Sequence, residues 1–137
     1  MTPQEAKREL RPLKDISRDI KAVMDEIERL ETVATKMTQN YDITPISGTP
    51  KNKMEEAIVK LEDYRSRLSN LVIETIDYRD KCRGKINQIE PRSLQTLLNL
   101  YYIQDNTLEK TAELMGKSVR WTYDMFTTAL EKYSEIS

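Results

Sequence analysis

Side chains that could carry out catalysis are scarce in this chain. Its 137 residues contain no histidine, which removes the commonest general base and metal ligand. Cys82 is the single cysteine, so no intramolecular disulfide can form and no second thiol can activate it. We expect Cys82 to be a small buried apolar residue in a reducing cytosol. Acidic side chains such as Asp25, Glu26, Glu28 and Glu31 fall on the exposed face of a helix. We therefore expect a protein that is not an enzyme and binds neither a metal nor a cofactor.

Residues 106 to 133 carry a pattern typical of two short helices that meet at a tight turn. Gly116 stands where the backbone must enter the left-handed region, which strains any residue with a β-carbon. Ala112 stands where the helices approach each other closely, so a larger side chain would push them apart. Thr107 and Ser118 are capping residues for the first and second helix. This spacing predicts a helix-turn-helix whose second helix starts at Ser118.

The second of these helices has one apolar and one polar face when its residues are placed about 100° apart. The expected inner face consists of Thr122, Met125, Phe126, Ala129, Leu130 and Tyr133. In a DNA-bound helix-turn-helix, the outward residues near the N-terminus of the second helix enter the major groove. The expected DNA-binding residues are accordingly Lys117, Ser118, Val119, Arg120, Tyr123, Asp124 and Thr127.

Four side chains of this segment have specific alternatives. Arg120 can donate two hydrogen bonds to guanine, or it can be a solvated surface charge. Asp124 can accept a hydrogen bond from cytosine, or it can repel the phosphate backbone. Lys117 can meet a phosphate at the start of the helix. Trp121 falls outside the apolar face, so it either packs on the preceding helices or contacts a partner.

The charge of the chain is nearly balanced, with a net charge of -1. Residues 1–89 hold 17 Lys and Arg and 16 Asp and Glu, whereas residues 90–137 hold 5 and 7. Neutralisation of phosphates by basic side chains supplies most non-specific affinity for DNA. The charge of the C-terminal segment therefore counts against tight DNA binding by that segment alone.

Two long amphipathic helices are expected in the first part of the chain. Thr2, Pro3 and Glu5 form a helix start with a capping box, and Pro12 predicts either a kink or a later start. Apolar residues then recur at helical spacing: Leu13, Ile16, Ile20, Val23, Ile27, Leu30, Ala34, Met37 and Tyr41. Residues 41–53 contain two prolines and a glycine and predict a loop.

A second periodic stretch extends from about Lys51 to Ile89. Its main apolar line consists of Ala57, Leu61, Tyr64, Leu68, Leu71, Tyr78 and Cys82. Two such helices most simply fold back as an antiparallel hairpin. Because Ile58, Val72 and Ile76 lie beside the main line, we expect a second copy of the chain to cover them. The prediction is a homo-oligomer, with a dimer as the expected assembly.

These patterns together predict an all-α protein with two domains. Residues 1–89 would form the coiled-coil-like oligomerisation hairpin, and residues 90–137 the helix-turn-helix domain. This second domain would begin with a further helix from Pro91 through Tyr101. No apolar run approaches the roughly 18 residues of a membrane span. We therefore expect no membrane partner, and we expect the cytoplasm of a bacterial host cell as the compartment.

The stretch TLEKTAELMGKSVRWTYDMFTTALEKY, residues 107–133, resembles without a gap the fourth conserved region of bacterial sigma-70 factors. The matching positions are Thr107, Leu108, Glu109, Glu113, Gly116, Ser118, Ala129, Leu130 and Lys132. The whole chain resembles small sigma-like transcriptional regulators of phages and prophages of Gram-positive bacteria. That wider resemblance rests on architecture and on residues such as KMEEAIVKLEDY, Ser118, Arg120 and Tyr123. Sigma factors carry several arginines on the reading helix, whereas only Arg120 is basic here.

The resemblance implies a transcriptional regulator that binds double-stranded promoter DNA. Together with the residue patterns above, it leads us to expect a regulator that is non-enzymatic and forms a homo-oligomer. The alternative is a helical interaction module in which the helix-turn-helix is only a scaffold. Such a module would bind RNA polymerase or another phage protein through Trp121, Tyr123 and the exposed apolar line. A DNA-packaging subunit is a third reading of the same architecture.

Overall fold

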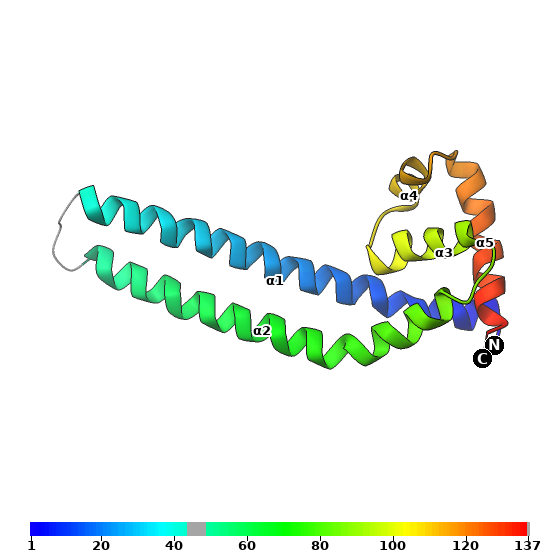
Figure 1. Ribbon diagram of the computed structural model, residues 1–137, viewed down its shortest axis with the longest axis horizontal. Helices are drawn as coiled ribbons and strands as arrows, with labels where there is room; N and C mark the ends of the chain where they lie inside the picture. Colours follow the sequence, from blue (N-terminus) through cyan, green and yellow to red (C-terminus); the bar gives the residue numbers. More distant parts are fainter. Residues whose placement is uncertain (44–48, 137) are drawn as a thin grey trace. The chain divides into compact units, whose positions relative to one another are not determined.

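The computed structural model describes residues 1–43 and 49–136, and most of these residues are helical, with no strand among them. The elements are α1 (Pro3–Ile43), α2 (Thr49–Ile86), α3 (Arg92–Leu98), its π-helical continuation η1 (Asn99–Ile103), α4 (Leu108–Met115) and α5 (Val119–Ser134), as Figure 1 shows. The expected all-α class is thereby confirmed. None of the helices in the described ranges is long and apolar enough to cross a membrane.

The ends of the first two helices differ in part from the sequence-based expectation. The hydroxyl of Thr2 accepts a hydrogen bond from the backbone N–H of Glu5 at 3.2 Å, as its capping role predicts. The helix then continues through Pro12, so a later start at that residue is wrong. The loop expected over residues 41–53 is too long, because α1 continues to Ile43 and α2 begins at Thr49. Residues 44–48 of that loop lie outside the described residues.

The chain divides into two compact units, and both of its ends belong to the same one. The terminal unit consists of Met1–Arg18 together with Thr75–Ser137, and the middle unit consists of Asp19–Glu74. This grouping differs from the division expected after residue 89, because both the start of α1 and the end of α2 pack with the C-terminal helices. Whether either sequence range folds as a domain by itself stays a prediction.

The core of the terminal unit is built from segments at both ends of the sequence. Its buried apolar residues come from α1, the end of α2, the connection that follows α2, α3, η1 and α5: Ala6, Leu10, Leu13, Cys82, Ile86, Ile89, Leu94, Leu97, Leu98, Tyr102, Ala129, Leu130 and Tyr133. Burial of one large apolar side chain stabilises a fold by roughly 1.5–3 kcal/mol. The start of α1 is therefore part of the support of α5 (Figure 1). Cys82 is buried as expected, and burial raises the pKa of its thiol.

One carboxylate joins the two long helices at the edge of this core. Glu9 of α1 pairs with Lys85 at 2.9 Å and with Lys81 at 3.1 Å, both from α2. Tyr78 also donates its hydroxyl hydrogen to the backbone carbonyl of Glu9. Burial opposes ionisation of Glu9, but its interactions with Lys85, Tyr133 and Lys81 together outweigh burial and lower the pKa of this carboxyl to about 2.

In the middle unit, parts of α1 and α2 lie side by side (Figure 1). Leu30 of α1 and Ala57 and Leu61 of α2 are buried, and Arg65 pairs with Glu31 at 3.0 Å across the two helices. Among the side chains of this unit that the structure describes, in residues 19–36 and 53–74, most other apolar ones are half-buried. Four large ones in these ranges are exposed: Met24, Ile58, Val59 and Ile73. Two helices thus cover only part of each other's apolar surface.

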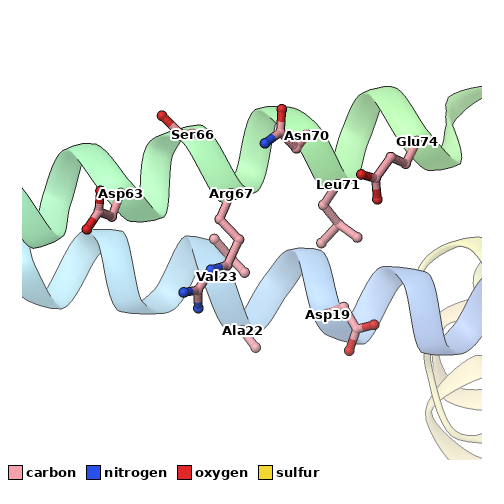
Figure 2. Close-up of a pocket in the computed structure, with 9 residues that line it drawn as sticks. All are labelled: Asp19, Ala22, Val23, Asp63, Ser66, Arg67, Asn70, Leu71 and Glu74. Atoms are coloured by element: carbon pink, nitrogen blue, oxygen red, sulfur yellow. The ribbon is translucent and has the colours of Figure 1, made fainter.

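An open groove of about 740 Å³ lies between the two helices of the middle unit. Figure 2 shows that Leu71 and Arg67 point from α2 toward α1, whereas Ser66 points away from it. The opposite side of the groove is formed by the small residue Ala22 together with Val23. The groove is therefore a place where two helices alone leave space unfilled.

Candidate nucleic-acid interface

Helix α4 begins with a side-chain cap. The Thr107 hydroxyl accepts a hydrogen bond from the backbone N–H of Lys110 at 3.1 Å. The hydroxyl of Thr111, which is fully buried, donates to the Thr107 carbonyl at 2.8 Å and so has its own partner. Ala112 is also buried, in agreement with its expected place between the helices. The cap predicted at Thr107 is confirmed.

The turn after α4 has the geometry of a Schellman motif. Gly116 has φ of 67° and ψ of 33°, which is the left-handed region. The N–H of Gly116 donates to the Glu113 carbonyl at 3.1 Å, and the N–H of Lys117 donates to the Ala112 carbonyl at 3.0 Å. A β-carbon added at Gly116 would meet no atom within 4 Å, so the positive φ alone favours glycine at this position.

Helix α5 begins at Val119, three residues after Gly116, again with a hydroxyl cap. The Ser118 side chain accepts a hydrogen bond from the backbone N–H of Trp121 at 3.0 Å. Thr122 is fully buried and donates its hydroxyl hydrogen to the Ser118 carbonyl at 2.9 Å. These bonds fix both the start of α5 and the direction of its first turn, as the sequence predicted.

The inner face of α5 packs on α3, η1 and α4. Thr122, Ala129, Leu130 and Tyr133 are buried, and Met125 and Phe126 are half-buried. The centre of the Phe126 ring lies 4.9 Å from the centre of the Tyr101 ring and 5.9 Å from the centre of the Tyr102 ring. Such contacts between rings add to the stability that burial provides. The predicted inner face is therefore the one that faces the core.

The seven residues predicted to contact DNA are all exposed on the turn and the outer face of α5. They are Lys117, Ser118, Val119, Arg120, Tyr123, Asp124 and Thr127. The side chain of Arg120 is 91% exposed, and that of Asp124 is 58% exposed. Their charged groups are 3.9 Å apart, one helical turn from each other, which is a weak pair in water.

Trp121 lies between the two faces of α5. It is half-buried, and the ammonium of Lys117 lies 5.2 Å from the centre of its ring. A cation held over an indole ring is attracted by the π electrons. One face of Trp121 is thus occupied by Lys117 itself, within the candidate interface.

The sequence reasoning missed the residues that hold the connection before α4. Asp105 has a positive φ of 53° and accepts hydrogen bonds from Arg18 at 3.0 and 3.2 Å. Lys14 pairs with Asp105 at 3.2 Å and donates to the Tyr101 carbonyl at 2.7 Å. The hydrogen bonds from Arg18, followed by those from Lys14, keep the pKa of Asp105 below its ordinary value. The recurrence of basic residues at helical spacing from Lys7 to Arg18 was the signal available in the sequence.

Comparisons of the chain with protein-family models, with curated proteins and with solved structures find no match.

Proposed function

We propose that this chain is a non-enzymatic, DNA-binding transcriptional regulator in which α4, the turn at Gly116 and α5 form a helix-turn-helix. One observation carries the proposal above the others. Arg120, in the first turn of α5, is 91% exposed while the opposite face of the helix is fixed in the core. A guanidinium in this position is available to a base edge without any rearrangement of the fold.

In this proposal the N-terminal part of α5 lies in the major groove of promoter DNA. Arg120 donates two hydrogen bonds to the O6 and N7 atoms of guanine, and Asp124 accepts one from the amino group of cytosine. The weak pair between Arg120 and Asp124 has to open or to be shared with the base, which costs little at an exposed position. Lys117 and Ser118 meet phosphates at the helix start.

The proposal also includes an oligomer formed through a hairpin of α1 and α2. The exposed side chains of Met24, Ile58, Val59 and Ile73 support it, because two helices leave this apolar surface uncovered. A second copy would cover it and bring two reading helices together. Two copies that bind half-sites about 34 Å apart multiply their affinities through effective concentration.

A second function is favoured by the aromatic side chains of α5. Tyr123 is 61% exposed, and Trp121, two residues earlier in the same helix, is half-buried. Tyrosine and tryptophan are enriched at protein interfaces. In this alternative the helix-turn-helix is a scaffold, and the two aromatic residues bind RNA polymerase or another phage protein.

Titration of the full chain with DNA from the neighbourhood of its own gene distinguishes the two functions. We expect binding with a preference for that DNA over an arbitrary duplex, and we expect Arg120→Ala to remove the preference. Lys132→Ala is the matched control, because it removes the same charge near the other end of α5. A preference that survives in Arg120→Ala, or no binding at low salt, would favour the alternative.

A further inference from the structure

The N-terminal part of α1 presents a row of basic side chains on the surface of the terminal unit. Together with Tyr101 and Tyr102 of η1, this row lines a cavity of about 500 Å³. The lining residues of α1 recur with helical spacing, so they share one face of the helix: Gln4, Lys7, Arg8, Arg11, Lys14, Asp15 and Arg18. Five of these side chains are cationic and one is anionic.

Two of the five cations hold the fold together. Lys14 is largely buried between Asp105 and the Tyr101 ring, whose centre is 3.7 Å from its ammonium. Arg18 is bound to Asp105 through two of its nitrogen atoms. These two residues therefore fix the connection before α4 against α1 and neutralise Asp105.

The other three cations, Lys7, Arg8 and Arg11, are exposed. Within residues 1–36 and 53–136, whose side chains the structure describes, none of the three has an ion pair or a side-chain hydrogen bond. The neighbouring acid Glu9 is already paired with the two lysines of α2. The three charges therefore have no direct ionic partner among the side chains that the structure describes.

The grouping of the chain in space also changes the charge of the unit that contains α5. The C-terminal segment of residues 90–137 has a net charge of -2, from 5 basic and 7 acidic residues. The terminal unit as a whole contains 14 basic and 12 acidic residues, a net charge of +2. The start of α1 supplies 5 of those basic residues and 3 of the acidic ones. The positive charge that α5 lacks is thus provided largely by α1 and the end of α2.

We propose that Lys7, Arg8 and Arg11, at the mouth of this cavity, bind phosphate groups of duplex DNA as a second contact besides α5. The choice of DNA as the partner rests on the proposed function. The three exposed cations span the four residue steps from Lys7 to Arg11, roughly 6 Å at the rise of an α-helix. Duplex DNA carries one negative charge for about every 1.7 Å of its axis, so roughly three phosphate charges fall within that length. The number of exposed cations therefore matches the number of phosphate charges over the same length.

Contacts of this kind carry affinity and no sequence information. Release of counterions from the phosphates makes the binding free energy strongly dependent on salt. Arg120 is the only basic residue on the outer face of the first turns of α5. That helix can therefore contribute little of the salt-dependent binding free energy. We expect the row on α1 to bind any duplex, while α5 distinguishes one sequence from another.

The test compares two triple variants of the full chain that have the same net charge. Lys7→Gln, Arg8→Gln and Arg11→Gln neutralise the row, and glutamine keeps a high helix propensity. The matched control replaces exposed lysines of the middle unit: Lys21→Gln, Lys36→Gln and Lys60→Gln. Circular dichroism checks that both variants keep their helices. The measurement is the Kd for an arbitrary duplex, by fluorescence anisotropy, between about 50 and 200 mM salt.

We expect the triple variant of the row to weaken binding at least about tenfold at the lowest salt. The slope of log K against log salt should become less negative by roughly 2.7, which corresponds to three lost phosphate contacts. The control should keep the slope of the unchanged chain. Equal slopes in both variants, or an equal loss in both, would overturn the proposal. Polyglutamate should compete poorly, and competition as strong as that of DNA would overturn the assignment to phosphates.

Failure of this inference and failure of the proposed function give different results. Arg120→Ala should leave the binding of an arbitrary duplex within about one unit of slope and remove only sequence preference. A chain that binds every duplex equally through α1 would contradict the proposed function and keep this inference. A sequence preference of the unchanged chain, together with unchanged binding of an arbitrary duplex by the triple variant of the row, would contradict this inference and keep the proposed function. No binding of any duplex would contradict both.

Discussion

Arg18 donates two hydrogen bonds to Asp105, at 3.0 and 3.2 Å, although the two residues are 87 positions apart in the sequence. Lys14 reaches the same carboxylate at 3.2 Å. The connection between η1 and α4 is therefore held by the start of α1. The position of α4 and, through it, the start of α5 depends on the N-terminal part of the chain.

Removal of the charge of Asp105 should destabilise the terminal unit. In Asp105→Asn the side chain still tolerates the positive φ, but Lys14 loses its counterion at a largely buried position. We expect a loss of about 1–3 kcal/mol in the free energy of unfolding, measured with urea. The control Asp15→Asn breaks only an exposed pair at 4.0 Å and should change this energy by less than about 0.5 kcal/mol. Equal effects would contradict the assigned role of Asp105.

The ion pairs of Glu9 should make stability depend on acid pH. Folding lowers the pKa of Glu9 from 4.5 to about 2. A lowered pKa in the folded state stabilises the protein above the pKa of the unfolded state, and this contribution is lost as pH falls from about 4.5 to about 2. Glu9→Gln should therefore have a lower Tm than the unchanged chain at pH above about 5, and the difference should shrink as pH falls. The control Glu5→Gln, at an exposed position, should leave the pH profile unchanged.

Two glycines should respond to alanine with opposite signs. Gly116 has φ of 67°, so Gly116→Ala should cost about 1 kcal/mol or more through backbone strain. Gly84 lies near the end of α2 with open space around it, so Gly84→Ala should stabilise the chain by up to about 1 kcal/mol. Urea unfolding of both variants measures the two energies. A neutral Gly116→Ala would show that the left-handed turn does not constrain the fold.

The exposed apolar residues of the middle unit should determine the assembly state. Ile73 is 68% exposed and Ile58 is 42% exposed. If a second copy covers them, light scattering should show an oligomer, and Ile58→Lys with Ile73→Lys should shift it toward the monomer. The control Val119→Lys makes the same type of change on an exposed residue of the terminal unit and should leave the assembly state unchanged. A monomer at high concentration of the unchanged chain would contradict the oligomer.

The sequence by itself determined the local features, because these arise from neighbouring residues. The caps at Thr2, Thr107 and Ser118 act on backbone groups three residues away, and the turn at Gly116 depends on the φ of one residue. The inner and outer faces of α5 follow from helical periodicity, so the predicted exposed set agrees with the structure.

Only the tertiary structure decided which distant segments pack together. The pairs of Arg18 with Asp105 and of Glu9 with Lys85 join residues that no local pattern relates, and they depend on how buried surfaces fit. The same packing brings the basic start of α1 into the unit of α5 and turns a net charge of -2 into +2. A count along the chain could not show this, because Coulomb interactions depend on distance in space rather than on order in the sequence.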